Sequence, residues 1–115
     1  MIRKHLWMGC ALLLLQLLTA EASAQEVKVG SLNDMTGPTS DVGKDVALGI
    51  REAVAYVNDT GGINGKKIKL FQYDYGYRVP EAITTYKRFR DFDKVVMVLG
   101  WGTGDTEALS PTVNA

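Results

Sequence analysis

The chain has 115 residues, of which 46% are hydrophobic and 23% charged, and its 13 basic and 13 acidic residues balance. This balance, without a basic block interleaved with aromatic residues, gives no reason to expect binding to nucleic acid or to an acidic membrane surface. The single cysteine, Cys10, and the single histidine, His5, both lie near the N-terminus. The rest of the sequence therefore excludes disulfides, thiol catalysis, and metal sites or catalytic dyads built on histidine.

Residues 1–24 have the pattern of a cleavable signal peptide. Basic residues at positions 3–5 precede an apolar stretch at 6–20, and Ala22 and Ala24 fit the small-residue rule for cleavage after position 24. The apolar stretch is shorter than the ~20 residues that a membrane-spanning helix needs. We therefore predict an exported protein whose mature chain begins at residue 25 and does not span the membrane.

The mature segment opens with a predicted strand at 27–32, which is rich in β-branched residues. A loop follows at 33–43, punctuated by Gly37 and Pro38. This loop either contributes to ligand binding or only turns the chain and caps the next helix, and its composition favours neither interpretation.

A long helix is predicted after this loop, with Ser40 or Asp41 as its cap. Gly61 and Gly62 can end it with a left-handed cap. Its apolar residues recur at helical spacing and predict a buried stripe, formed by Val42, Val46, Ile50, Val54 and Val57.

The remaining elements alternate in the same way. Residues 63–66 predict a tight turn that connects the helix to a strand at 67–74. Pro80 suits a first helical position, and residues 91–94 close that helix before a strand at 95–99. The apolar positions of the second helix are Ala82, Ile83, Tyr86 and Phe89.

This alternation predicts an α/β fold in three layers, with a parallel sheet covered by helices on both faces. The run at 95–99 is apolar throughout, as expected of a strand buried on both faces. Three strands are few for an open parallel sheet, and residue 115 falls inside a third predicted helix. We therefore expect residues 25–115 to be the N-terminal part of a longer protein.

A glycine-rich run at 100–106 follows the last strand and is the main candidate for a binding site. In open parallel sheets, ligands bind just past the carboxyl ends of the strands. Glycines let the backbone approach a ligand closely, and hydroxyls and free amides offer hydrogen bonds. The candidate ligand-binding residues here are Trp101, Gly102, Thr103, Gly104, Asp105 and Thr106.

Some of these residues have structural alternatives. Asp105 fits a helix N-cap, which we favour over a ligand contact, and Trp101 either covers a ligand or packs under the loop. The glycine spacing departs from the dinucleotide-binding pattern, and Gly43 and Lys44 are not followed by the hydroxyl residue of a phosphate-binding loop. We therefore predict no nucleotide and no cofactor.

Asp74 ends the strand at 67–74 among Tyr73, Tyr75 and Tyr77. We favour a strand-end carboxylate satisfied by local hydrogen bonds over membership of a polar, aromatic cleft rim. No two carboxylates in the sequence form a convincing acid/base couple. The carboxylates therefore give no candidate catalytic residue.

Several segments occur in a specific order: the strand from Val27, the stretch 35–38 with Gly43 further on, the run Asn58-x-x-Gly61-Gly62-Ile63-Asn64-Gly65-Lys66, Asp74, and Gly100 after an apolar strand. Together they resemble the periplasmic solute-binding proteins of branched-chain amino acid ABC transporters. The resemblance covers nearly all of residues 25–115. It implies the first part of lobe one of a type I periplasmic-binding-protein-like fold, whose two lobes close on a ligand about a hinge.

The resemblance also implies a periplasmic location and a role in binding, without enzyme activity. Such a protein captures a small solute, here a branched-chain amino acid, an amide or a related carboxylate, and delivers it to the membrane subunits of an ABC permease. The family's aromatic contact to the ligand side chain falls on Val42, and its serine contact falls on Gly104. Thr103 or Thr106 can supply a hydroxyl in place of that serine.

Two other functions stay open at this point. One is a ligand-sensing domain of the same fold, which serves a receptor or regulator. The other is a nucleotide-dependent enzyme with a Rossmann-like sheet, which the sequence supports least, because it lacks the glycine pattern after the first strand and begins with an export signal.

Overall fold

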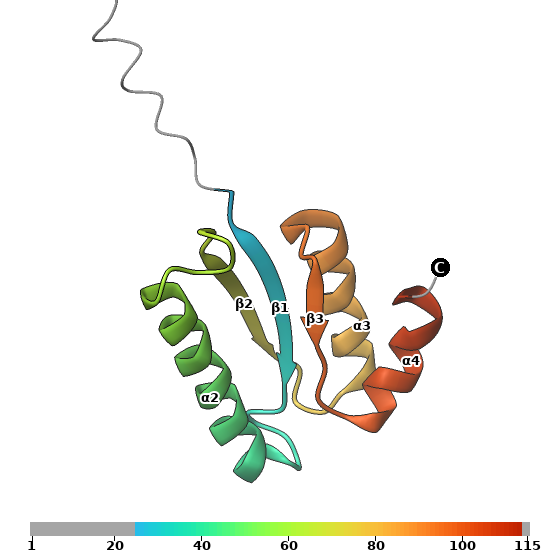
Figure 1. Ribbon diagram of the computed structural model, residues 1–115. Coiled ribbons are helices and arrows are strands. Elements are labelled where there is room, and N and C mark those ends of the chain that lie inside the picture. Colours follow the sequence, from blue (N-terminus) through green and yellow to red (C-terminus); the bar gives the residue numbers. More distant parts are fainter. Residues whose placement is uncertain (1–24, 114–115) are drawn as a thin grey trace, which may run out of the picture.

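The computed structural model describes residues 25–113, so the predicted signal peptide lies outside the described residues. Three strands alternate with helices (Figure 1). The elements are β1 (Val27–Asn33), α2 (Ser40–Asp59), β2 (Ile68–Asp74), α3 (Val79–Arg88), the π-helical turn η2 (Phe89–Asp93), β3 (Met97–Leu99) and α4 (Thr103–Val113).

The strands form one parallel sheet in the order β2-β1-β3. Val27 pairs with Ile68 at one edge of β1, and Val29 pairs with Met97 at the other. Helix α2 covers one face of the sheet, and α3 and α4 lie side by side on the opposite face (Figure 1). The predicted three-layer α/β architecture is confirmed.

The core lies between the sheet and the helix pair α3–α4. Its fully buried residues include Leu32 of β1, and Ala82 and Phe89 from α3 and the turn that follows it. Gly30 allows this packing, because a Cβ at that position would lie 2.7 Å from the ring of Phe89. The predicted apolar side of the second helix is therefore confirmed.

The predicted stripe of α2 is displaced by one position at its N-terminal end. Gly43 and Ala47 are buried, whereas Val42 is 61% exposed and Val46 is 38% exposed. The cause is the close approach of Gly43 to the preceding loop, where a Cβ would lie 1.8 Å from the carbonyl oxygen of Asp34. Only a glycine fits against this carbonyl, and that contact fixes the rotation of the helix.

The end of α2 and the turn after it agree with prediction. Gly61 and Gly62 adopt positive φ angles of 112° and 74°, and the Gly62 N–H donates to the Val57 carbonyl at 2.8 Å. Asn64 and Gly65 form a tight turn closed by backbone hydrogen bonds between Ile63 and Lys66. This turn connects a helix to a strand, as predicted.

The third strand differs from its prediction. It spans only Met97–Leu99, and Val96 and Met97 are 75% and 51% exposed. The strand pairs only with β1 within residues 25–113, so it is an edge strand and not one buried on both faces. The sequence of β3 is as apolar as that of an interior strand, but β3 is an edge strand of the described sheet.

Candidate functional site

Three loops follow the carboxyl ends of the three strands and meet at one edge of the sheet, because parallel strands all end on the same side. They comprise residues 34–39 after β1, 75–78 after β2, and 100–102 between β3 and α4. Hydrogen bonds between their side chains and backbones hold these loops to one another. We call this edge the strand-end rim.

Asp34 organises the loop after β1. Its carboxylate is fully buried and accepts hydrogen bonds from the Gly37 N–H at 2.5 Å, and from the Thr39 N–H and hydroxyl, each at 2.7 Å. Burial is the largest single influence on the pKa of Asp34 and raises it. The hydrogen bonds from Thr39 and Gly37 outweigh burial, so the pKa lies below its ordinary value of 3.8.

Asp74 joins the loop after β1 to the loop after β2. Its carboxylate accepts from the Met35 N–H at 2.9 Å, the Thr36 hydroxyl at 2.6 Å and the Gly76 N–H at 2.9 Å. Burial raises the pKa of Asp74, but these hydrogen bonds together lower it below 3.8. The prediction of a satisfied strand-end carboxylate is confirmed.

Trp101 connects the third loop to the first. Its indole Nε1–H donates to the Thr39 hydroxyl oxygen at 2.8 Å, and its ring is half-buried against the core. The same Thr39 hydroxyl donates to Asp34, so one oxygen serves both loops. Trp101 and the loop containing Pro38 therefore lie on the same rim, as the binding-site hypothesis requires.

Asp105 is the third residue of α4 and is 98% buried, with 2% of its surface exposed. Its Oδ1 accepts from the Gly102 N–H at 3.0 Å and from the Tyr75 hydroxyl at 2.6 Å. The predicted N-cap position is wrong, because α4 begins at Thr103. The side chain reaches back to the N–H before the helix, as the acidic member of a capping box does.

Tyr75, the partner of Asp105, is 1% exposed and belongs to the core. It does not form the aromatic cleft rim, the alternative that the sequence favours less. Burial, then the hydrogen bond to Asp105, raises the pKa of its hydroxyl well above 10.0. Gly102 lies against this pair, since a Cβ there would be 2.6 Å from Asp105 Oδ1 and 2.8 Å from the Tyr75 oxygen.

The other predicted residues also lie at or beside the rim. Thr103 is exposed and Gly104 half-buried in the first turn of α4, and the Thr106 hydroxyl donates to the Gly102 carbonyl at 2.6 Å. Val42 is exposed at the start of α2, and its N–H donates to the Thr39 carbonyl at 3.2 Å. Val42 therefore lies one helical turn from Thr39, next to the loop that follows β1.

Sequence reasoning missed Asp34 and Thr39 as the centre of this arrangement. A signal was present, because an Asp followed three residues later by Gly and five later by Thr is typical of a side-chain-stabilised turn. The described residues contain no group of His, Cys, Asp and Glu side chains able to hold a metal ion.

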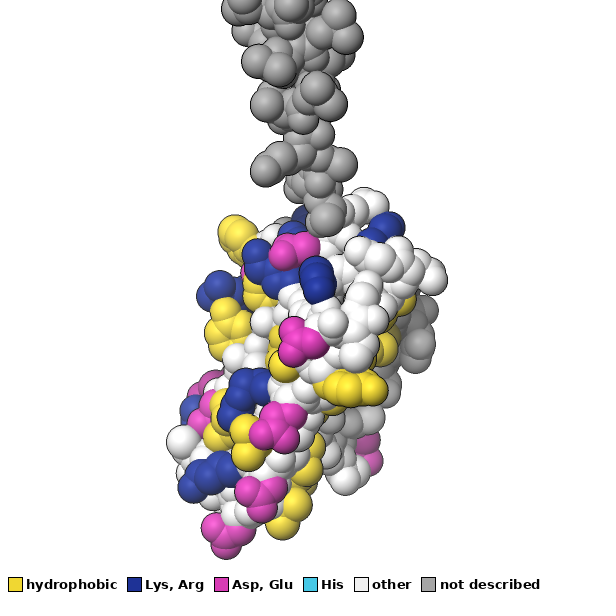
Figure 2. Space-filling view, turned by 60° about the vertical axis from the view of Figure 1, so that its left-hand side comes forward, with side chains coloured by type: hydrophobic (Ala, Val, Ile, Leu, Met, Phe, Trp, Pro, Cys, Tyr) yellow, Lys and Arg dark blue, Asp and Glu magenta, His cyan; other side chains and the backbone are white. Residues whose placement is uncertain are grey.

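Charged side chains of both signs are mixed on one face of the molecule (Figure 2). Figure 2 shows the face on which α2 lies, where basic, acidic and hydrophobic side chains are interspersed without an extended field of one sign. Within residues 25–113, no helix combines the length and apolar character needed to cross a bilayer.

Known proteins resemble this chain in sequence and structure. The Leu/Ile/Val-binding protein homolog 7 of Brucella abortus is 38% identical over 86% of this chain. The substrate-binding protein of an ABC transporter from Aeropyrum pernix is 42% identical over 77% of this chain, with a TM-score of 0.73. The branched-chain amino acid transporter substrate-binding protein of Streptococcus pneumoniae, solved in complex with isoleucine, is 26% identical over 78% of this chain, also with a TM-score of 0.73.

The chain spans about a quarter of these three relatives, with coverage of 24%, 24% and 26% of their lengths. Two of them are described as substrate-binding proteins and the third as a Leu/Ile/Val-binding protein homolog. The family model described as "Periplasmic binding protein" matches residues 26–115. The chain therefore belongs to the periplasmic binding protein family and has the α/β architecture of a type I binding-protein lobe.

Proposed function

We propose that residues 25–115 form one wall of the solute-binding cleft of an extracytoplasmic receptor that serves an ABC importer. The supporting observation is the hydrogen bond between Trp101 and Thr39, which ties the glycine-rich loop to the loop that carries Pro38. Two loops far apart in sequence thereby present one continuous surface at the strand-end rim. A solute held there is passed to the permease subunits without chemical change.

The rim has separate polar and apolar parts. The first turn of α4 contains Thr103 and Gly104, and the amides of a helix N-terminus favour a carboxylate. Val42 and the ring of Trp101 supply apolar surface beside it. Asp34, Asp74 and Asp105 are engaged by hydrogen bonds within the protein, so the rim's acidic groups hold the loops in place.

This division fits a small aliphatic carboxylate, and we propose a branched-chain amino acid as the principal solute, with amides and related carboxylates as the wider class. The names of the Brucella and Streptococcus relatives support this choice. Gly104 replaces a serine in the family pattern, so Thr103 and Thr106 are the proposed sources of a hydroxyl contact.

A thermal-shift screen of the exported chain tests this proposal, because a ligand that binds the native state raises its melting temperature. The panel contains leucine, isoleucine, acetamide, benzoate and ATP. We expect a concentration-dependent rise with leucine or isoleucine that Thr103→Val reduces and that Thr84→Val, on the exposed side of α3, leaves unchanged. A rise with ATP alone contradicts the proposal.

A further inference from the structure

The turn that connects α2 to β2 lies at the edge of the sheet opposite the strand-end rim (Figure 1). Asn64 and Gly65 form its tip, with positive φ angles of 50° and 78°. Backbone hydrogen bonds between Ile63 and Lys66, at 2.8 Å and 2.9 Å, close the turn. An Asn-Gly pair is favoured in such a turn because both central residues must adopt positive φ. The same pair of residues also has a reactive chemistry.

An asparagine followed by glycine can lose its side-chain amide without an enzyme, and asparagine is among the thermolabile residues of proteins. The backbone nitrogen of the next residue attacks the asparagine Cγ and closes a succinimide ring. The side-chain nitrogen leaves as ammonia, taking with it the proton of the attacking nitrogen. Water then opens the ring at either carbonyl and gives aspartate or isoaspartate. The reaction needs a free amide, a free backbone N–H and little bulk on the next residue.

The side-chain amide of Asn64 is free. Asn64 is exposed, and its amide makes no hydrogen bond within residues 25–113. The other asparagines of this range are held in place. Asn33 is 1% exposed and accepts a hydrogen bond at 2.7 Å. Asn58 donates to the Ile68 carbonyl at 2.9 Å and accepts from the Ile68 N–H at 2.7 Å.

The attacking group at Asn64 is free as well. The hydrogen bonds of the turn are made by Ile63 and Lys66, and the Gly65 N–H has no acceptor in the part of the chain that the structure describes. A Cβ at Gly65 would have no heavy atom within 4 Å, so no neighbouring group obstructs this nitrogen. The asparagines in β1 and α2 are instead followed by Asp34 and Asp59, whose side chains hinder ring closure.

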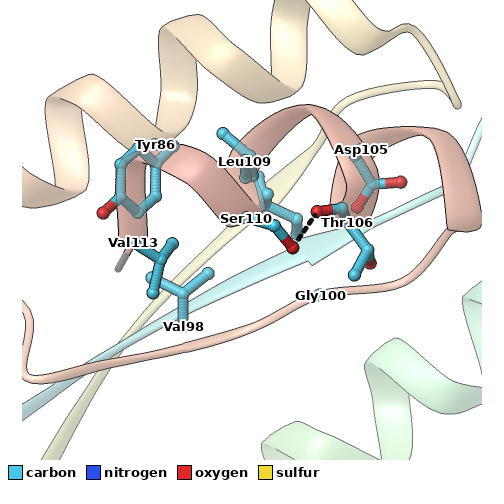
Figure 3. Close-up of a pocket in the computed structure, with 9 residues that line it drawn as sticks. Tyr86, Val98, Gly100, Asp105, Thr106, Leu109, Ser110 and Val113 are labelled. Atoms are coloured by element: carbon cyan, nitrogen blue, oxygen red, sulfur yellow. Dashed lines mark hydrogen bonds between the residues drawn. The ribbon is translucent and has the colours of Figure 1, made fainter. Parts of the chain in front are cut away.

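The openness around Gly65 distinguishes it from a glycine near the strand-end rim. Figure 3 shows Gly100 beside Asp105 and Thr106, which belong to the first turn of α4. A Cβ at Gly100 would lie 3.8 Å from Asp105 Oδ2 and 3.7 Å from Thr106 Oγ1. Neighbouring side chains therefore surround Gly100, whereas Gly65 projects into solvent.

Ring closure also needs rotation about the bonds of Asn64. Positive φ is uncommon for a residue with a side chain, and only the two hydrogen bonds between Ile63 and Lys66 close the turn. Exposed loop tips open locally at little cost in free energy. The turn can therefore bring the Gly65 nitrogen to the Asn64 Cγ while the rest of the protein stays folded.

We propose that Asn64 is a site of spontaneous deamidation in the folded protein, and that isoaspartate is its disruptive product. Water is the only co-reactant. The modification adds a negative charge to the connection between α2 and β2 and leaves the strand-end rim unchanged. This inference goes beyond the proposed function and does not depend on the solute.

The turn is packed too closely against the end of α2 to accept a longer backbone. A Cβ at Gly62 would lie 2.1 Å from the Lys66 carbonyl oxygen. Isoaspartate inserts a methylene group into the main chain, so Ile63 and Lys66 cannot keep both of their hydrogen bonds. Aspartate leaves the backbone unchanged, and Asp-Gly also fits a tight turn with two positive φ angles. We therefore expect isoaspartate to destabilise the fold and aspartate to have little effect.

Mass spectrometry of the full chain after incubation in mildly alkaline buffer tests the site. Trypsin cleaves after Arg51 and Lys66, so a single peptide, 52–66, contains both Asn58 and Asn64. We expect the mass shift from amide to acid at Asn64 and none at Asn58, and a protein isoaspartate methyltransferase should methylate part of the product. Asn64→Gln should stay unmodified, because its longer side chain closes a ring far more slowly. Equal conversion at Asn58, or an Asn64 that is converted only when urea unfolds the chain or not at all, overturns the proposal.

Thermal denaturation separates the effects of the two products. The incubated protein should contain a fraction whose melting temperature is lower by roughly 5 °C. Asn64→Asp has the charge of the product on a normal backbone and should melt with the unincubated wild type. Asn64→Gln, incubated in the same way, controls for other chemical changes. If Asn64→Asp melts as low as the incubated fraction, or if incubation leaves the melting temperature unchanged, isoaspartate is not a disruptive product.

Discussion

The indole Nε1 of Trp101 donates a hydrogen bond to Thr39 Oγ1 at 2.8 Å, across 62 positions of sequence. Thr39 in turn donates to Asp34, so a tryptophan after β3 is connected to a buried carboxylate after β1. The strand-end rim is therefore one hydrogen-bonded unit. We expect a substitution in one loop to change the energetic effect of a substitution in another.

A double-mutant cycle tests this connection. Trp101→Phe and Thr39→Val should each destabilise the protein, and their effects should be coupled by about 1 kcal/mol, the net value of a typical hydrogen bond. Urea unfolding of the wild type, both single variants and the double variant measures the coupling. Strictly additive effects would show that the two residues do not interact in solution.

Two glycines of α2 should respond in opposite directions to the same substitution. Gly43→Ala places a Cβ 1.8 Å from the Asp34 carbonyl, whereas a Cβ at Gly49 has no heavy atom within 4 Å. We expect Gly43→Ala to destabilise the protein by about 3 kcal/mol or more and Gly49→Ala to stabilise it by up to about 1 kcal/mol. Chemical denaturation of the two variants provides the comparison, and equal effects would contradict the described packing of α2.

Stability should fall in acid because of the carboxylates at the rim. The pKa of Asp74 is lower in the folded protein than its ordinary 3.8. Its ionised carboxylate therefore contributes fully to the free energy of unfolding above the pKa of the unfolded chain, and this contribution is lost as the pH falls through the pKa of the folded protein. We expect the free energy of unfolding to decline from about pH 5 downward. The measurement is a series of urea denaturations at decreasing pH.

Thr36→Val provides the matched test of that decline. It removes a hydroxyl donor to Asp74, so the folded pKa rises toward 3.8 and the acid-dependent loss becomes smaller. Thr84→Val is the control, because the Thr84 hydroxyl donates to the Pro80 carbonyl and not to a carboxylate. If the free energy of unfolding declines equally steeply with falling pH in the wild type, Thr36→Val and Thr84→Val, Asp74 is not the source of the decline.

The buried pair of Tyr75 and Asp105 should be sensitive to the loss of one oxygen. Tyr75→Phe leaves Asp105 Oδ1 with the Gly102 N–H as its single donor, and we expect destabilisation of about 1 kcal/mol, the net value of one hydrogen bond. Tyr77→Phe is the control, since Tyr77 is 37% exposed. Thermal denaturation of both variants measures the difference in stability between them. Equal melting temperatures would contradict a buried hydrogen bond at Tyr75.

Export can be tested by determining where the chain is cleaved. If residues 1–24 are a signal peptide, protein recovered from the periplasm of a bacterial host begins at Gln25, and its intact mass shows this directly. Ala24→Leu should block cleavage, because the site requires a small residue. Recovery of uncut protein from the cytoplasm alone would refute the predicted signal.

Much of the fold could be predicted from local sequence. The glycines after α2 and the apolar spacing of α3 mark features that depend on a few neighbouring residues, and the structure confirms both. The rotation of α2 could not be predicted from its valines, because it is set by the contact of Gly43 with the distant carbonyl of Asp34.

The placement of the last loop could be predicted from sequence, but its contacts could not. The rule for parallel strands places residues 100–102 past the end of β3, and the structure agrees, whereas residues 103–106 begin α4. The role of Asp105 could not be read from sequence, because it depends on Tyr75, which lies 30 positions away. The exposure of β3 depends on which strands flank it. The neighbours of a strand cannot be predicted from its own composition.

The absence of a side chain at Gly30 has a mechanical consequence. The ring of Phe89 rests directly on the backbone of β1 and also lies 5.6 Å from the ring of Tyr73, centroid to centroid. Phe89 thereby packs the junction of α3 and η2 against the middle of the sheet, away from the loops at the rim. This anchor in the middle of the sheet does not depend on the hydrogen bonds that hold the rim loops to one another.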